Sequence, residues 1–221
     1  MHVEALFTRD SVGRLVRINE PRGGTAPRFF LGRTKEGTDV WLRDDLEEEL
    51  VAELEALAER GPSGIDVGAA EAARFEAILA RSAAVGPMYS GPAFAFPSTL
   101  TPSQSAVQIT AENADLLRPL LNEWHNDAED CQPLFAVVLD GHAVAVCGSV
   151  RRSTRAHEAG VETAEEHRRK GHATAAVSSW ASAVVEAGRL PLYSTSWSNR
   201  ASLALARRLG LVQFATDLYI A

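Results

Sequence analysis

The dipeptide Asp140-Gly141 constrains the fold of this chain most, because it separates two apolar, valine-rich runs, 134–140 and 142–150. Asp and Gly both tolerate the positive φ angles that a two-residue hairpin turn requires, and apolar runs on either side are typical of paired strands. The sequence therefore predicts an antiparallel β-hairpin in the C-terminal half of the chain.

Alternating strand and helix patterns surround this hairpin. In chain order they predict a strand at 107–110, a helix at 114–126, the hairpin, a strand at 159–164, a helix at 172–187, a strand at 191–197, a helix at 199–210 and a last strand at 211–220. Gly188 and Gly210 stand where glycine commonly ends a helix. The C-terminal half is thus predicted to be α/β.

The first ninety or so residues have patterns of their own. Short runs predict strands at 13–18, 28–32 and 39–42, and periodic apolar residues predict helices at 45–60 and 69–81. Asp45 is expected to cap the first of these helices, with Glu48 three residues on, and Gly61-Pro62 to end it. Between Val85 and Pro102, Gly and Pro break any helix, so two domains are predicted, 1–96 and 97–221.

Composition excludes several functional classes. The chain has 221 residues and a net charge of -7, which argues against a nucleic-acid binder, so any anion site must be local. No run approaches the roughly 20 apolar residues of a membrane span, and a cytoplasmic protein without membrane attachment is expected. The two cysteines, Cys131 and Cys147, and the histidines lack metal-ligand spacing, so no metal site is expected.

A basic turn, residues 168–173, lies between a predicted strand and a predicted helix. Backbone N–H groups and the helix dipole converge there on an anion. Gly171 lets the backbone come close to a phosphate oxygen, and Ala173 is small enough not to block the approach. The turn is therefore predicted to bind phosphate, although a solvated basic loop that caps a helix is the simpler alternative.

With these residues the chain resembles the GNAT superfamily of acyl-CoA-dependent N-acyltransferases. The family motif Gln/Arg-x-x-Gly-x-Gly/Ala, which holds the pyrophosphate of acyl-CoA, is matched by Arg168, Gly171 and Ala173. A second family element, an Asn that begins the next helix, a small polar residue and a Leu-Gly pair, is matched by Asn199, Ser202 and Leu209-Gly210. The resemblance covers about 97–221 and implies a mixed, mainly antiparallel sheet flanked by helices, preceded by a small N-terminal α/β region.

The resemblance also implies a reaction, the transfer of an acyl group, with acetyl expected, from acetyl-CoA to an amine. The residues implied to bind the CoA are Thr163, Ala164, Arg168, Arg169, Lys170, Gly171, His172, Ala173, Asn199 and Ser202. The amine belongs to a small molecule or a peptide. The N-terminal region and the helix at 117–124 are expected to share the acceptor cleft, and a homodimer stays open.

Proton transfer needs a base and an acid. Glu158 and Glu162, on one face of a strand because their separation is even, are the candidate bases, with His157 as a further option. A backbone N–H near 162–164 is expected to bind the oxyanion. Many family members have a Tyr where this chain has Ala206, so the acid is Ser202, Tyr193, water or absent.

Two other functions stay open at this point. A non-catalytic acyl-CoA-binding or sensing module would keep the turn without the proton-transfer groups, and Ala206 favours it. Another kind of nucleotide-binding domain ranks below both, because the chain has no glycine-rich P-loop and no dinucleotide fingerprint. Several of the chosen residues also have purely structural interpretations, such as Asn199 as a helix cap and the two glutamates as solvent-facing strand residues.

Overall fold

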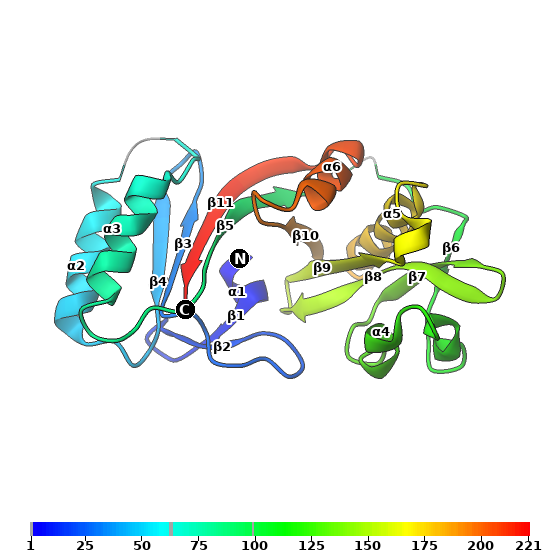
Figure 1. Cartoon of the computed structure of the whole chain (residues 1–221), viewed down its shortest axis with the longest axis horizontal. Coiled ribbons are helices and arrows are strands. Elements are labelled where there is room, and N and C mark those ends of the chain that lie inside the picture. Colours follow the sequence, from blue (N-terminus) through cyan, green and yellow to red (C-terminus); the bar gives the residue numbers. More distant parts are fainter. Residues whose placement is uncertain (1, 62–63, 99) are drawn as a thin grey trace. The chain divides into compact units, whose positions relative to one another are not determined.

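The computed structural model describes residues 2–61, 64–98 and 100–221 (Figure 1). It contains two compact units, each built from separate stretches of sequence. Unit 1 comprises the first residues through Ala5, 95–193 and 201–212, and unit 2 comprises 6–94, 194–200 and 213–221. The expected division into 1–96 and 97–221 stays a prediction, and Pro62, the expected helix stop, lies outside the described residues.

Unit 2 has a sheet with two helices on one face. Its elements are β1 (Phe7–Arg9), β2 (Leu15–Ile18), β3 (Phe29–Arg33), β4 (Thr38–Leu42), α2 (Glu48–Glu59), α3 (Ala69–Leu79), β5 (Met88–Ala95) and β11 (Val212–Ile220). The strand order is β4-β3-β11-β5, and β3 is antiparallel to both β4 and β11. Side chains of α2 and α3 pack on Phe29, Leu31 and Leu218 in one core cluster.

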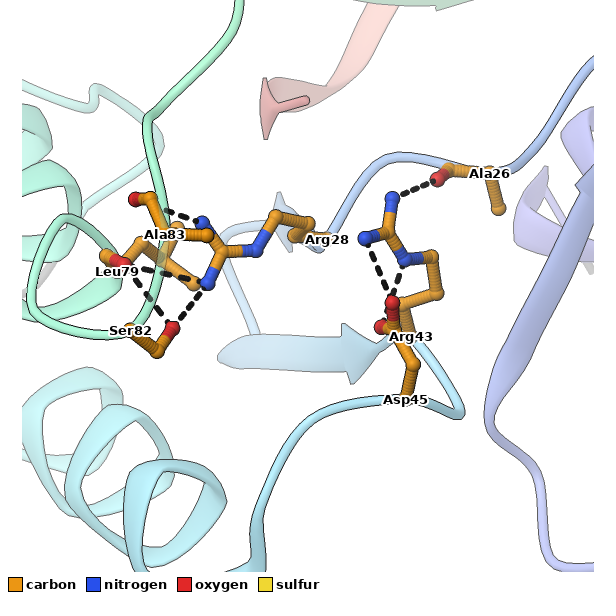
Figure 2. A network of polar contacts seen from close by, with 7 residues as sticks. All are labelled: Ala26, Arg28, Arg43, Asp45, Leu79, Ser82 and Ala83. Carbon is orange, nitrogen blue, oxygen red and sulfur yellow. Dashed lines mark hydrogen bonds and ion pairs between the residues drawn. The ribbon is translucent and has the colours of Figure 1, made fainter.

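The predicted strands and helices of this region are present, but the predicted cap of α2 is wrong. Helix α2 begins at Glu48 after Glu47, and no side chain caps it. Asp45 is engaged elsewhere, because Arg43 donates to both of its carboxylate oxygens, at 2.7 and 2.8 Å (Figure 2). This pairing lowers the pKa of Asp45 and leaves its carboxylate unavailable to the helix.

A buried arginine, Arg28, comes directly before β3 and binds the C-terminal end of α3. The Arg28 guanidinium, on a side chain only 5% exposed, donates to the carbonyl of Leu79 at 3.1 Å, to the hydroxyl of Ser82 and to the carbonyl of Ala83 (Figure 2). Carbonyls at a helix end lack partners within the helix, and a cation also suits the negative end of the dipole. Arg28 therefore has a structural role at the C-terminus of α3.

The Gly and Pro-rich segment that was expected to be a boundary contains a strand, β5, of eight residues. Gly91 has a structural role in this strand. A β-carbon on Gly91 would lie 1.8 Å from the carbonyl oxygen of Thr195, so the glycine permits a close backbone approach inside unit 2. The boundary that the sequence predicted in this segment stays a prediction.

Unit 1 has a mixed, mainly antiparallel sheet flanked by helices, as predicted. Its elements are α1 (His2–Leu6), β6 (Ala106–Gln108), η1 (Ala114–Leu117), α4 (Asn122–Asn126), β7 (Leu134–Leu139), β8 (His142–Arg152), β9 (Ala156–Thr163), η2 (Glu165–His167), α5 (His172–Glu186), β10 (Leu190–Ser194) and α6 (Arg200–Arg208). The strand order is β10-β9-β8-β7-β6, in which only β9 and β10 are parallel. The predicted hairpin is β7–β8, with φ of 50° at Asp140 and 80° at Gly141.

Helices cover both faces of this sheet (Figure 1). Ala175 of α5 packs with Val137 and Val144 on one face, and Leu117 and Leu121 pack on the other. The single helix expected at 114–126 is wrong: it is divided into η1 and α4, and Pro119, which has no N–H to donate, lies between them. Within the described ranges, no helix has the length and apolar character needed to cross a bilayer.

Candidate functional site

The basic turn lies where the sequence predicted it, between β9 and α5. Its backbone is unusual, because Arg169 has a φ of 63° and Gly171 a φ of 89°. Gly171 is the N-cap residue of α5, and no side chain caps that helix end. A glycine accepts this left-handed conformation without strain, and successive N–H groups in such a turn form a concave anion site.

The N–H groups at this end of α5 are unused. In the part of the chain that the structure describes, the backbone N–H groups of Lys170, Gly171 and His172 donate to no backbone acceptor, whereas the N–H of Ala175 already bonds the carbonyl of Gly171. A helix of 15 residues has a substantial dipole, whose positive end lies here. The turn can therefore receive an anion.

Side chains around the turn add positive charge, but not all of them point outward. Nε of Arg168 donates to the carbonyl of Thr163 at 3.2 Å, which fastens the turn to the end of β9. Arg169 and Lys170 are exposed. His172 lies with its ring 6.3 Å from that of His167, and burial, followed by the charges of His167 and Lys170, lowers its pKa, so it is neutral at pH 7.

Two parallel strands, β9 and β10, separate on the way to this turn. The register joins β10 to β9 only from Leu190–Ala156 to Leu192–Glu158, while β9 continues to Thr163 beside β8. Among the described residues, no strand therefore pairs with this edge of β9 from Ala159 onward, and the edge is called open here. Its unpaired peptide groups can bond an extended, amide-containing ligand in the way that a neighbouring strand would.

The alternation of β9 shows which N–H groups face this open edge. The N–H of Ala164 donates to the carbonyl of Val144 on β8, at 2.9 Å. Residues at even positions therefore direct their peptide groups to β8, and Val161 and Thr163 direct theirs to the open edge. Of the region 162–164 expected to bind an oxyanion, only Thr163 has a suitably directed N–H.

The two candidate bases share a face of β9 but differ in environment. Glu162 is exposed and accepts a hydrogen bond of 2.7 Å from the indole of Trp124, whose ring also lies against Gly160. Glu158 is 3% exposed, at the point where β9 and β10 separate, and its carboxylate lies 3.7 Å from His2. No local pattern indicates the His2 contact, because α1 is far from β9 along the chain.

His157, the further option for the base, faces the opposite side of the sheet. Its Nδ1 lies 2.8 Å from the hydroxyl of Ser149, which accepts a 3.0 Å hydrogen bond from the indole of Trp180. Burial, with Arg189 and Arg152 nearby, lowers the pKa of His157 to about 4. This network ties β8, β9 and α5 together beneath the helix.

Candidate acids meet between β10 and α6. Tyr193, 3% exposed, forms a side-chain hydrogen bond with Ser202, and its pKa is raised to about 12 by burial above all. Ala206, where many members of the GNAT superfamily have Tyr, is one helical turn beyond Ser202. It is 1% exposed, so its side chain is already surrounded by other atoms. Asn199 precedes α6 in a segment of unit 2, and its N–H donates to the carbonyl of Ser196.

The described part of unit 1 therefore brings together an anion-binding turn, an open strand edge that leads to it, a buried carboxylate and a protonated phenol. Elsewhere in the described residues, no group of three His, Cys, Asp or Glu side chains is placed to hold a metal ion. The arrangement suits a long ligand with a phosphate group at one end and a reactive carbonyl at the other.

Comparison with known proteins identifies the class. Residues 132–216 match the family model described as GNAT acetyltransferase. This range contains the β7–β8 hairpin, the split strands, the turn and α6, so the resemblance to the GNAT superfamily is confirmed over residues 132–216. Among curated proteins, none matches.

Solved structures show the same fold at low sequence identity. A GCN5-related N-acetyltransferase from Sphaerobacter thermophilus is 16% identical with a TM-score of 0.51, and the match covers 91% of this chain and 78% of that one. A GCN5-related N-acetyltransferase-like protein from Streptococcus suis is 17% identical with a TM-score of 0.50, covering 88% and 84%. A GNAT-family structure from Novosphingobium aromaticivorans is 17% identical with a TM-score of 0.49, and this chain covers 66% of its length.

Proposed function

We propose that this protein transfers an acyl group, with acetyl as the expected one, from acyl-CoA to an amine. The observation that supports this proposal best is the join of the open β9 edge to the turn at Gly171. The pantetheine arm of CoA is an extended chain with two amides, and its diphosphate is an anion. A single bound molecule would thus bond the edge with its amides and the turn with its phosphates.

The residues of unit 1 then have defined roles. Glu158 accepts the proton of the attacking amine, directly or through water, because it is the buried carboxylate at the strand split. The N–H of Val161 or Thr163 stabilises the oxyanion of the tetrahedral intermediate. The C–S bond then breaks, and the CoA sulfur receives a proton from the hydroxyl of Tyr193, which is hydrogen-bonded to Ser202 and follows Leu192, the last residue of β10 paired with β9.

A glycine substitution tests the anion site directly. Gly171→Val should lower the affinity for CoA at least about tenfold, since the side chain blocks the approach of a phosphate and strains the turn. Gly188→Val is the matched control, because Gly188 follows the same helix with a φ of 72°. Apart from its chain neighbours, no atom of the described residues lies within 4 Å of the position of its missing β-carbon. Equal CoA affinity of both variants and the wild type, by calorimetry, would refute the proposed site.

A non-catalytic CoA-binding module is the second candidate, and Ala206 is the observation that favours it. Both functions predict CoA binding. Only the enzyme releases free thiol from acetyl-CoA when an amine is supplied, so a thiol assay against a panel of small amines and peptide N-termini separates them. Binding without thiol release on any amine would favour the module.

The role of the N-terminal region in acceptor choice belongs to the same proposal. Deleting it would be a poor test, because β11 pairs with β3 along five residue pairs and would lose its partner. Substitutions at half-buried side chains of unit 2, such as the stacked Tyr89 and Tyr219, keep the fold and report on acceptor preference. A changed order of amines in the panel would support the role.

A further inference from the structure

A cation from a different helix lies at the turn. The Nη2 atom of Arg208, on α6, is 3.7 Å from the position that a β-carbon on Gly171 would occupy. Apart from the adjoining backbone, no other atom of the described residues lies within 4 Å of that position. The two residues are far apart in the sequence, and both belong to unit 1. The space in front of Gly171 is therefore bordered by a guanidinium.

This guanidinium is available for a ligand. Arg208 is exposed, and across the described residues it forms no hydrogen bond or ion pair. The Nε of Arg168, by contrast, donates to the carbonyl of Thr163. The spacing of the motif draws attention to Arg168, but the guanidinium of Arg208 lies next to the glycine.

We infer that Arg208 binds the diphosphate of CoA opposite the N–H groups of the turn, so that α6 forms one wall of the anion site. This inference rests on the proposed function. A guanidinium offers a planar pair of donors that matches two phosphate oxygens, and charge-assisted hydrogen bonds of this kind are the strong ones. In a chain with a net charge of -7, a cation placed at the site itself is also needed to offset the repulsive field.

Helix α6 provides its own control. Arg207 is exposed like Arg208 and carries the same charge, so Arg207→Gln and Arg208→Gln change the overall charge equally. We expect Arg208→Gln to weaken CoA binding about tenfold, since one charge-assisted contact is lost, and Arg207→Gln to change it less than about twofold. Arg208→Lys should recover part of the loss, because the charge returns without the planar pair of donors.

Three ligands identify the group that Arg208 contacts. Affinities of wild type and Arg208→Gln are measured by calorimetry for CoA, for dephospho-CoA, which keeps the diphosphate, and for pantetheine, which has no phosphate. The inference expects equal fold losses for CoA and dephospho-CoA and none for pantetheine. A loss for CoA alone would assign Arg208 to the 3′-phosphate and overturn the inference.

Failure of this inference and failure of the proposed function give different results. Two results would show that Arg208 is not the diphosphate contact: Gly171→Val loses CoA affinity while Arg208→Gln does not, or Arg207→Gln and Arg208→Gln lose it equally. The proposed CoA site at the turn would be unaffected by either result. If wild-type protein does not bind CoA, the proposed function itself fails. Far-ultraviolet circular dichroism and thermal unfolding of each variant confirm that the comparison is made on folded protein.

Discussion

His2 and Glu158 meet inside unit 1, with Nε2 of the imidazole 3.7 Å from a carboxylate oxygen and side-chain exposures of 12% and 3%. Burial first, with positive charges including Arg151 contributing, lowers the pKa of His2 to about 3. The imidazole is therefore neutral at pH 7, and the contact is not an ion pair. Glu158 thus has a neutral polar neighbour from α1 and Arg151 directly across from it on β8.

From this environment we predict that Glu158, and not Glu162, acts as the base. Glu158→Gln should lower kcat about 100-fold or more, the size expected for loss of a general base, with CoA affinity unchanged. Glu162→Gln should have a small effect, because the exposed Glu162 is engaged by Trp124 and a Gln oxygen can still accept that hydrogen bond. Steady-state kinetics with a reactive amine measures kcat, and calorimetry measures the CoA affinity. A larger loss of kcat in Glu162→Gln than in Glu158→Gln would assign the role of base to Glu162.

Tyr193 is predicted to act as a donor to the departing sulfur. Because burial raises its pKa to about 12, its hydroxyl stays protonated throughout the usual assay range. Tyr193→Phe removes only that hydroxyl and should lower kcat about tenfold or more, with little change in KM for acetyl-CoA. Ser202→Ala, which removes the partner of the hydroxyl, should give a smaller loss; a Tyr193→Phe enzyme with wild-type kcat at every pH would show that the sulfur leaves unassisted.

The sequence predicted those parts of the fold that local chemistry decides. Asp140-Gly141 predicted the hairpin, and the basic turn was predicted between a strand and a helix, where the structure gives Gly171 a φ of 89°. The error at Asp45 arose because Arg43, only two residues earlier, binds its carboxylate and competes with the helix end. The close approach of Gly91 to Thr195 joins distant segments, and no local pattern records it.

The site was predictable to the same extent. The turn was found because its residues are contiguous, and Glu158 and Glu162 because strand alternation places them on one face. Periodicity cannot show that Glu158 is buried beside His2 or that Arg208 approaches Gly171, since both contacts join elements far apart in the chain. Tertiary contacts therefore supply the distinctions among candidates that the sequence left open.

The network of His157 predicts acid sensitivity. His157 is 7% exposed and its pKa in the folded protein is about 4, below the ordinary histidine value of 6.5. The unfolded chain therefore takes up this proton first as the pH falls. The stability that the neutral ring contributes is complete above pH 6.5 and is lost progressively down to about pH 4, at a cost of up to about 3 kcal/mol.

Urea unfolding between pH 7 and pH 4 measures this effect. In His157→Gln the amide oxygen can accept from Ser149, but the side chain does not titrate, so its unfolding free energy should fall less steeply with pH than that of the wild type. His125→Gln is the control, because His125 is paired near the surface with Asp115. Parallel curves for the wild type and His157→Gln would assign the acid sensitivity to other groups.

The buried ion pair of unit 2 should be essential to its fold. Arg33, 1% exposed, donates to both carboxylate oxygens of Glu71, one at 2.7 Å, and also to Thr38 and to the carbonyl of Asp66. Removing one partner leaves a buried charge without compensation, so Arg33→Met and Glu71→Gln should each lower the unfolding free energy by about 3–5 kcal/mol. The double variant should be less destabilised than the sum of the two, as urea unfolding would show. The exposed pair Arg81 and Glu53 is the control, and its loss should cost less than about 1 kcal/mol.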